Sequence, residues 1–174
     1  MRLRVCVLLC SVVAATLMLP IATAGAATGT VCKTEAGSSV FSPTLPAKPD
    51  NVVNTVQHTN GTLSGCNNGV TGGTFTATEK IGNANCATAA ALASKHITNE
   101  TITWEPASKG TSTLRLTKVT TQQGGTFRGT VTAGRFKGTQ VSFPLVWVKF
   151  GPSGACGTTG LKTITFESAA AVHI

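Results

Sequence analysis

Apolar and polar residues alternate in short runs along most of this chain. The runs are clearest at residues 74–78, 113–117 and 126–132, where threonine or arginine alternates with an apolar residue or glycine. A period of two places alternate side chains on one face of a β-strand, and turns rich in glycine or asparagine separate the runs. The pattern therefore predicts an all-β domain of about seven to nine strands, folded as an antiparallel sandwich or a partly open barrel.

Turn residues divide these runs into hairpins. Asn60-Gly61 predicts a turn between two strands. Ala133-Gly134 predicts the turn of a hairpin whose second strand begins at Arg135. The motif Gly-x-Phe-x-Gly-Thr occurs at residues 125–130 and again at 134–139, and we interpret it as one solution used in both strands of this hairpin. Residues 87–95 have helix propensity and predict one short helix.

The segment 28–50 differs in composition from the alternating runs. Three prolines, Pro43, Pro46 and Pro49, lie close together there, and proline cannot donate a hydrogen bond in a central strand. We expect an edge strand or extended arm that Cys32 ties to a β domain of residues 51–168. Residues 169–174 are predicted to form a short C-terminal tail.

The first residues have the three-part layout of a secretory signal. Two arginines precede an apolar stretch that ends near Pro20, and small residues come after it. We predict a signal peptide of residues 1–24, cut after Ala24 or Ala26, and a mature protein that is secreted or associated with the cell envelope. The alternative is an uncleaved anchor, which Pro20 and the alanine-rich end disfavour. No later segment is apolar enough to span a membrane.

Loss of this signal removes two of the six cysteines. The even number that remains predicts disulfides, because the compartment outside the cytoplasm is oxidising. Four cysteines allow three pairings, and the sequence leaves all of them open; we favour Cys32–Cys66 and Cys86–Cys156. Free thiols or a zinc site are the alternative, but the chain has no Cys-x-x-Cys motif.

The mature chain is basic, since loss of two arginines lowers the formal net charge only from +8 to +6. Cations gather on three neighbouring predicted strands and form a candidate anion-binding face for an anionic envelope polymer or another protein. Its members are Arg115, Lys118, Arg128, Arg135 and Lys137. The simpler alternative is a solvated surface of a basic protein.

Aromatic residues argue against two classes of partner. The chain has no tyrosine, and its phenylalanines fall in core register, so no stacking platform for nucleic acid is expected. Trp104 and Trp147 also occupy predicted core positions, which disfavours a carbohydrate-binding module.

No catalytic or metal-binding constellation stands out. The three histidines, His58, His96 and His173, are isolated from one another, and no nucleophile elbow is present. Glycoside hydrolysis needs two carboxyl groups at one sugar site. The candidates are Glu79, Glu100, Glu105 and Glu167. Glu100 and Glu105 differ by an odd number within one strand and should point to opposite faces. We therefore interpret these acids as solvated charges and expect no catalytic residue, cofactor or metal.

Several segments together resemble a known group of proteins. They are residues 61–66, Cys86 after an asparagine-rich turn, residues 101–104, residues 129–138 and Cys156 ahead of residues 163–166. Over about residues 52–168 the chain is similar to the small exported, threonine- and glycine-rich β-proteins of actinobacteria. The resemblance implies a secreted, sandwich-like fold and transfers no catalytic residue.

These observations favour a secreted, non-enzymatic β domain that binds a cell-envelope or extracellular partner. The alternative is an extracellular hydrolase that acts on envelope polymers or carbohydrates. A hydrolase should bring one of the four candidate carboxylates together with a histidine or a second acid in a cleft, whereas a binding module should leave these residues scattered.

Overall fold

The computed structural model describes residues 28–48, 50–86, 97–121, 124–150 and 160–174. The predicted signal peptide, its two candidate cut sites, the predicted helix at 87–95 and Cys156 lie outside these residues.

The described chain is built from β-strands joined by turns, as the alternation predicts. One short 3-10 helix, η2 (Ala107–Lys109), lies between two of them. The strands are β1 (Val31–Cys32), β2 (Thr34–Leu45), β3 (Val53–Ser64), β4 (Gly72–Ala84), β5 (Ile97–Glu105), β6 (Thr111–Thr121), β7 (Gly124–Gly134), β8 (Gln140–Phe150), β9 (Leu161–Ser168) and β10 (Val172–His173).

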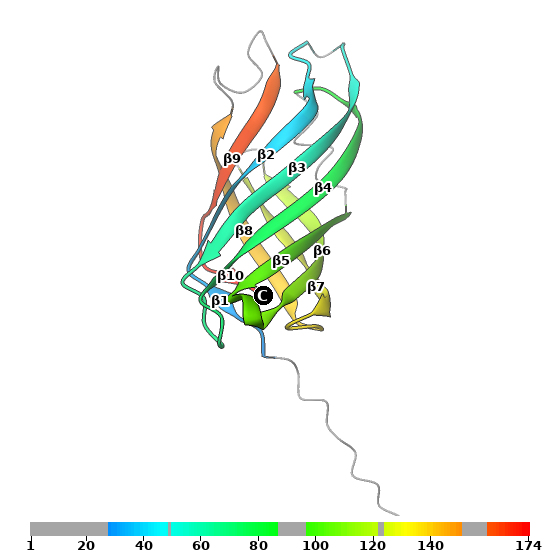
Figure 1. Ribbon diagram of the computed structural model, residues 1–174. Helices are drawn as coiled ribbons and strands as arrows, with labels where there is room; N and C mark the ends of the chain where they lie inside the picture. Colours follow the sequence, from blue (N-terminus) through cyan, green and yellow to red (C-terminus); the bar gives the residue numbers. More distant parts are fainter. Residues whose placement is uncertain (1–27, 49, 87–96, 122–123, 151–159) are drawn as a thin grey trace, which may run out of the picture.

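The strands β2 to β9 form a closed antiparallel barrel of eight strands. Each strand pairs with the next along the chain, and β9 completes the ring because it pairs with β8 on one side and β2 on the other (Figure 1). The all-β prediction is thus confirmed. Of the two architectures that the sequence left open, the protein has the barrel, and the barrel is closed rather than partly open.

The two short strands seal one end of the barrel, which we call the closed end. β1 pairs with β10, and β10 pairs with the start of β8, so the described N- and C-terminal segments lie side by side (Figure 1). Ile174 N–H donates to the Thr30 carbonyl at 2.8 Å, and the side chains of Cys32, Val172 and Ile174 are buried. The predicted tail therefore contributes to the core instead of lying free.

The main hydrophobic core fills the closed end. Trp104 is fully buried there, and its indole N–H donates to Ser112 Oγ at 2.8 Å. A second cluster lies at the opposite, far end, where β2, β3, β4 and β9 extend beyond β5 to β7 (Figure 1). Its buried members are Phe41, Leu45, Ile81, Ala84, Cys86 and Leu161.

The prediction of an edge strand or arm for residues 28–50 is wrong. This segment holds β2, which pairs with β3 on one side and β9 on the other. The rule about proline still holds locally. Pairing with β3 ends at Ser42, and Pro43 falls within a register irregularity of the β2–β9 ladder, so no regular ladder bond is lost. The barrel domain thus begins well before residue 51.

Two predicted turns are also placed differently. Asn60 and Gly61 lie inside β3, which runs without a break from Val53 to Ser64. Residues 135–138 form the turn between β7 and β8, and the second strand of that hairpin starts at Gln140 instead of Arg135. Phe136 and the two flanking glycines, Gly134 and Gly138, adopt positive φ there, a conformation that a regular strand does not use.

Two glycines that face each other across β2 and β3 shape the barrel interior. Gly37 and Gly61 are paired in register. A Cβ at Gly61 would collide with the Phe75 ring, and a Cβ at Gly37 would lie 2.7 Å from Phe166 Cζ. The rings of Phe75 and Phe166, with centroids 6.2 Å apart, therefore occupy the space that these glycines leave open.

This packing predicts that Gly61→Ala destabilises the barrel by about 1–3 kcal/mol, the usual cost of overpacking a tight interior. The free energy of unfolding, from chemical denaturation, measures the effect. Gly82→Ala is the matched control, because a Cβ there would meet only Asn54 Oδ1, at 3.4 Å. Equal stability of the two variants would contradict the packing described.

Candidate binding cavity inside the barrel

A cavity of about 60 Å³ lies inside the barrel, between the closed-end core and the far end. This exceeds the roughly 10–15 Å³ that one water molecule requires. Fourteen side chains line it: Glu35, Ser39, Gln57, Thr59, Phe75, Ala77, Glu79, Thr98, Glu100, Leu116, Phe127, Phe143, Leu145 and Phe166.

The cavity has a polar wall and an apolar wall. The polar lining residues all come from β2, β3, β4 and β5, whereas β6, β7, β8 and β9 contribute only apolar residues. Both walls follow from strand alternation, since each lining residue sits at an inward position of its strand. A small barrel of eight strands has an interior just wide enough to be filled by side chains or to hold one small ligand.

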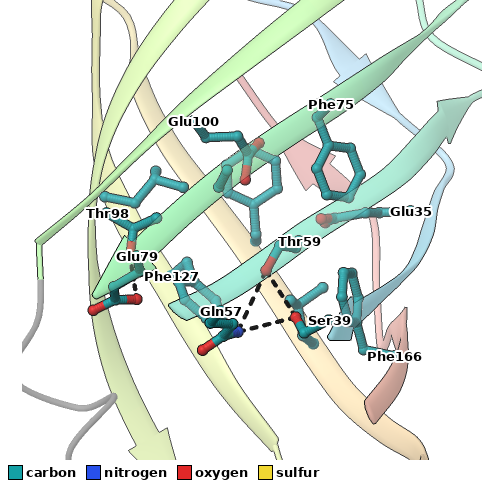
Figure 2. A pocket seen from close by; sticks show the side chains of 14 residues that line it. Glu35, Ser39, Gln57, Thr59, Phe75, Glu79, Thr98, Glu100, Phe127 and Phe166 are labelled. Carbon is teal, nitrogen blue, oxygen red and sulfur yellow. Dashed lines mark hydrogen bonds between the residues drawn. The ribbon is translucent and has the colours of Figure 1, made fainter. Parts of the chain in front are cut away.

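Hydrogen bonds organise part of the polar wall. Ser39 Oγ and Thr59 Oγ1 are 2.8 Å apart, and the Gln57 amide donates to Ser39 Oγ at 2.9 Å. Figure 2 shows this triangle of side chains at one side of the cavity. On the neighbouring strands, Thr98 Oγ1 donates to the Glu79 carboxylate at 2.9 Å.

Two further carboxyl groups lie deeper in the cavity. Glu35 on β2 and Glu100 on β5 are 3% and 7% exposed, and Figure 2 shows both side chains among the lining residues. Glu35 Oε2 and Glu100 Oε1 are buried and have no hydrogen-bond partner within the described part of the chain. Such buried polar atoms are uncommon and costly in a folded protein.

Burial changes the acidity of both groups. It raises the pKa of Glu35 from 4.5 to about 9, with repulsion from Glu100 as the smaller cause. It also raises the pKa of Glu100 from 4.5 to about 8. In the absence of a bound cation both carboxyls are therefore mainly protonated at pH 7, and each can both donate and accept a hydrogen bond.

Exposure varies along the wall of the cavity. Phe75 and Phe166 are buried like Glu35 and Glu100, whereas Gln57, Glu79, Thr98 and Phe127 are partly exposed. The partly exposed residues lie nearer the ends of β3, β4, β5 and β7 that form the far end (Figure 1). The cavity therefore reaches solvent at the level of these four residues, with the two buried acids at its inner part. Farther along β3 and β4, Thr55 and Ile81 are buried again.

The structure brings together two of the four predicted candidate carboxylates. Glu79 and Glu100 line the cavity, whereas Glu105 and Glu167 are exposed on the outside of the barrel. The prediction that Glu100 and Glu105 point to opposite faces is confirmed. The interpretation of all these acids as solvated charges is wrong for Glu100, because strand alternation and ring closure place it in the interior.

Sequence analysis missed Glu35, which lay in the segment expected to be an arm. A signal was nevertheless present. Phe41 and Leu45 are buried in the same strand, and both differ from residue 35 by an even number. Once residues 34–45 are recognised as a strand, the period of two places Glu35 on the inward face with them.

The five cations of the predicted anion-binding face occupy two places. Arg115 and Arg128 are exposed on the outside of adjacent strands, at diagonal positions in the β6–β7 ladder, and Lys118 pairs with Phe127 in that ladder. Arg135 and Lys137 lie in the β7–β8 turn at the closed end. Arg135 donates to the Asn68 carbonyl at 3.0 Å and lies over the Phe136 ring.

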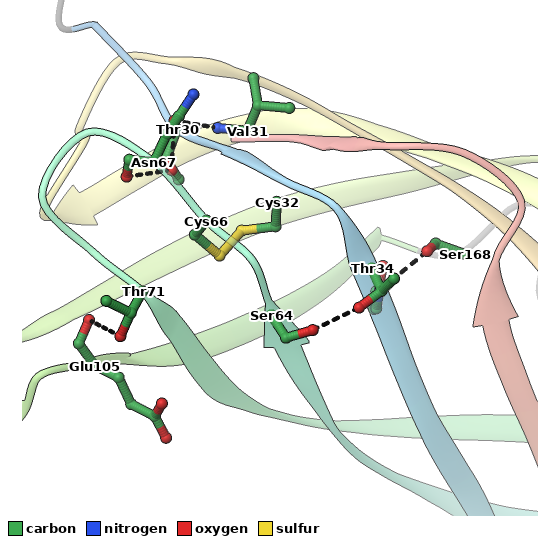
Figure 3. Close-up of a disulfide and its surroundings, with 11 residues drawn as sticks. Thr30, Val31, Cys32, Thr34, Ser64, Cys66, Asn67, Thr71, Glu105 and Ser168 are labelled. Atoms are coloured by element: carbon green, nitrogen blue, oxygen red, sulfur yellow. Dashed lines mark hydrogen bonds between the residues drawn. A yellow bond between two sulfur atoms is a disulfide. The ribbon is translucent and has the colours of Figure 1, made fainter.

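The predicted disulfide between Cys32 and Cys66 is present. It joins the last residue of β1 to the segment that follows β3, beside the polar pair Thr34 and Ser64 (Figure 3). Cys86 is also disulfide-bonded. Its predicted partner, Cys156, lies outside the described residues. The confirmed bond anchors the closed end, next to the strand that carries Glu35.

The predicted aromatic and histidine positions are placed as follows. Trp104 is buried, as expected, and Trp147 pairs with Phe166 in the β8–β9 ladder. His58 and His173 are exposed on β3 and β10, and His96 lies outside the described residues. Within the described ranges, no group of three or more histidine, cysteine or acidic side chains is arranged to hold a metal ion.

No family model, curated protein or solved structure matches this chain. The resemblance to exported actinobacterial β-proteins stays a prediction. Among the described residues, no helix has the length and apolar character needed to cross a membrane.

The raised pKa values of Glu35 and Glu100 predict that the protein is more stable at pH 5 than at pH 8. Both groups bind a proton more tightly in the folded than in the unfolded state, where the pKa is about 4.3. Their contribution is complete below that value and falls as the pH rises toward 8 and 9, by about 1.4 kcal/mol per pH unit for each group. Thermal and urea unfolding across this range measures it.

Substitution isolates this effect from other titrations. Glu35→Gln and Glu100→Gln should each flatten the pH dependence and stabilise the protein at pH 8, because glutamine carries no charge to desolvate. Glu167→Gln, an exposed position on β9, is the control and should leave the dependence unchanged. A flat profile in the unsubstituted protein would contradict the burial of these acids.

The disulfide gives a second prediction for this region. Its cysteines are separated by 34 positions, and the chain-entropy model rates a loop of that length at about 3–4 kcal/mol. The variant Cys32→Ala/Cys66→Ala should therefore lose about that much free energy of unfolding in denaturant titrations. Thr34→Ala, an exposed neighbour, should lose less than about 1.5 kcal/mol. A loss no larger than that of the control would mean that the bond contributes little.

Proposed function

We propose that this protein is an extracellular, non-enzymatic binding barrel that holds one small molecule in its interior cavity. The observation that carries the proposal is a pair of buried carboxyl groups, Glu35 and Glu100, whose oxygens face an unfilled cavity and lack hydrogen-bond partners in the described chain. Unpaired buried polar groups cost stability. They are explained if a ligand supplies the missing hydrogen bonds.

The shape of the site favours a small ligand over a polymer. The cavity lies within a ring of paired strands and contains buried aromatic side chains, so a bound ligand is enclosed by the ring and a polymer chain cannot pass across the barrel. An envelope polymer would need an open groove or an outer face. We therefore retain the extracellular binding role that the sequence favours. The proposed binding site, however, lies inside the barrel and not on the outer surface of its strands.

An extracellular location is supported by two features. The disulfide between Cys32 and Cys66 is typical of proteins outside the reducing cytoplasm. The predicted signal peptide provides the route of export.

A hydrolase is the second candidate, because Glu35, Glu79 and Glu100 converge on one cavity, as expected above for a hydrolase, instead of lying scattered. Glycoside hydrolysis requires one ionised carboxylate and one protonated acid, with space for a sugar between them. Burial instead raises the pKa of both deep acids, and the cavity is small. We therefore favour binding without turnover.

The proposed function predicts that small probes bind inside the barrel. Three probes of equal length are n-butanol, n-butylamine and butyrate, each titrated into isotope-labelled protein and followed by NMR. At least one should shift signals of cavity residues such as Ala77, Thr59 and Phe166. Ala77→Phe, which fills the cavity from β4, should abolish these shifts. Ala77→Leu provides a smaller filling residue if the phenylalanine variant does not fold.

Thr76→Phe is the matched control, because Thr76 is the exposed neighbour of Ala77 on the same strand. It should leave the shifts unchanged. Binding that survives in a folded Ala77→Phe or Ala77→Leu variant, or shifts confined to the outer surface, would overturn the proposal. Release of 4-nitrophenol from 4-nitrophenyl glycosides, lost in Glu100→Gln, would favour the hydrolase instead.

A further inference from the structure

The cavity concentrates the acidic residues of a basic protein. The chain has only 6 acidic residues against 14 basic ones, yet Glu35, Glu79 and Glu100 all line this cavity. None of the described lining side chains is basic. We infer that the ligand is a small organic cation, a protonated amine with a short apolar body, bound with its head at Glu35 and Glu100. This inference rests on the proposed binding function.

The buried oxygens suit an ammonium head. An ammonium group has three N–H donors and no acceptor, and Glu35 Oε2 and Glu100 Oε1 are acceptors without a partner in the described chain. Glu100 is close enough to Glu35 for its charge to raise the pKa of Glu35. An ammonium between them would relieve that repulsion and make charge-assisted hydrogen bonds, which are roughly twice as strong as neutral ones.

The opposite wall suits the apolar body of such a ligand. Phe127, Phe143 and Phe166 come from β7, β8 and β9 and face the polar wall across the cavity. Phenylalanine rings pack against hydrocarbon and also attract cations over their faces. A bare metal ion would gain little from this wall, and the described acids are not arranged as a set of three metal ligands. An anionic ligand would meet three glutamates and no compensating cation.

Binding of an ammonium should release protons. The titratable side chains that face the site are Glu35 from β2, Glu79 from β4 and Glu100 from β5, while the described lining residues of β3 and of β6 to β9 carry none. Because burial raises the pKa of Glu35 to about 9 and that of Glu100 to about 8, both are mainly protonated at pH 7. An ammonium favours the carboxylate form. Its affinity should therefore rise between pH 6 and pH 8, by up to about tenfold per pH unit for each proton released.

The test compares the same three probes on the unsubstituted protein. NMR titration should give a dissociation constant for n-butylamine at least about tenfold lower than for n-butanol at pH 8, with butyrate the weakest. Calorimetry in phosphate and in MOPS, which differ in ionisation enthalpy, should show proton release for n-butylamine at pH 7 and none for n-butanol.

Matched variants locate the ammonium head. Glu100→Gln should weaken n-butylamine about tenfold or more, to the level of n-butanol, and leave n-butanol binding within about twofold. Glu35→Gln is the second variant and should act in the same direction. Glu105→Gln removes an exposed carboxylate from the same strand as Glu100 and should change neither probe.

The outcomes separate this inference from the function on which it rests. Equal binding of n-butylamine and n-butanol inside the cavity, or tighter binding of butyrate, would overturn the cation inference and leave the binding barrel standing. Preference for n-butylamine that persists in both Glu35→Gln and Glu100→Gln would also overturn it. If none of the three probes binds in the cavity, the binding function and the cation inference both fail.

Discussion

Closure of the strand ring is the constraint on which the rest of this structure depends. β9 pairs with β8 on one side and with β2 on the other, and this pairing closes the ring. The start of β2 is also bonded to β9, because the Glu35 N–H donates to Ser168 Oγ at 2.9 Å. Once the ring is closed, every second side chain is directed into a space with little solvent, whether it is apolar or not. The burial of Glu35 and Glu100 follows from this closure.

Inside the ring, side-chain volume is distributed unevenly. Trp104 and the buried apolar residues around it fill the closed end, and the terminal strands cover them. Farther along, Gly37 and Gly61 remove two side chains from the inner face, and the rings of Phe75 and Phe166 occupy that space. The same barrel therefore has a tightly packed end, which stabilises it, and a cavity beside it. One side of this cavity is an apolar wall from the main hydrophobic cluster, and the polar residues of β2 to β5 line the other side.

Two buried acids are an expensive feature for a domain of this size, since typical folding free energies are only about 5–15 kcal/mol. Replacing them with leucine or isoleucine would avoid the cost of their desolvation at neutral pH. Both acids line the cavity opposite aromatic side chains that belong to the main hydrophobic cluster, and this position connects the cost to the cavity. The disulfide at the closed end offsets part of such a cost, because it restricts the unfolded chain. The bond and the unpaired Glu35 oxygen lie near the same end of the barrel, because Glu35 pairs with Leu63 on β3, three residues before Cys66.

Local pattern was enough to identify much of this protein. Alternation identified the strands around Phe75, Ile102, Leu114 and Val131, and these side chains are buried as their register requires. The even number of cysteines in the predicted mature chain predicted disulfides, and the favoured pair, Cys32 and Cys66, is bonded, although the sequence left the pairing open. These features depend on residues near one another in sequence or on simple chemistry, so the sequence could reveal them.

Tertiary structure alone decided the rest. Sequence analysis did not recognise β2 as a central strand, because prolines lie within residues 43–49 and the rule against proline in such a strand is local. The place of β2 in the ring depends instead on its pairing with β9, which is far away in the chain. Gly61 looked like a turn residue, and only the Phe75 ring beside it explains why a glycine stands in mid-strand. The convergence of Glu35, Glu79 and Glu100 likewise required three strands to curve around one axis. Strand period tells which face a residue takes, but the closure of the sheet decides whether that face meets solvent or encloses a site.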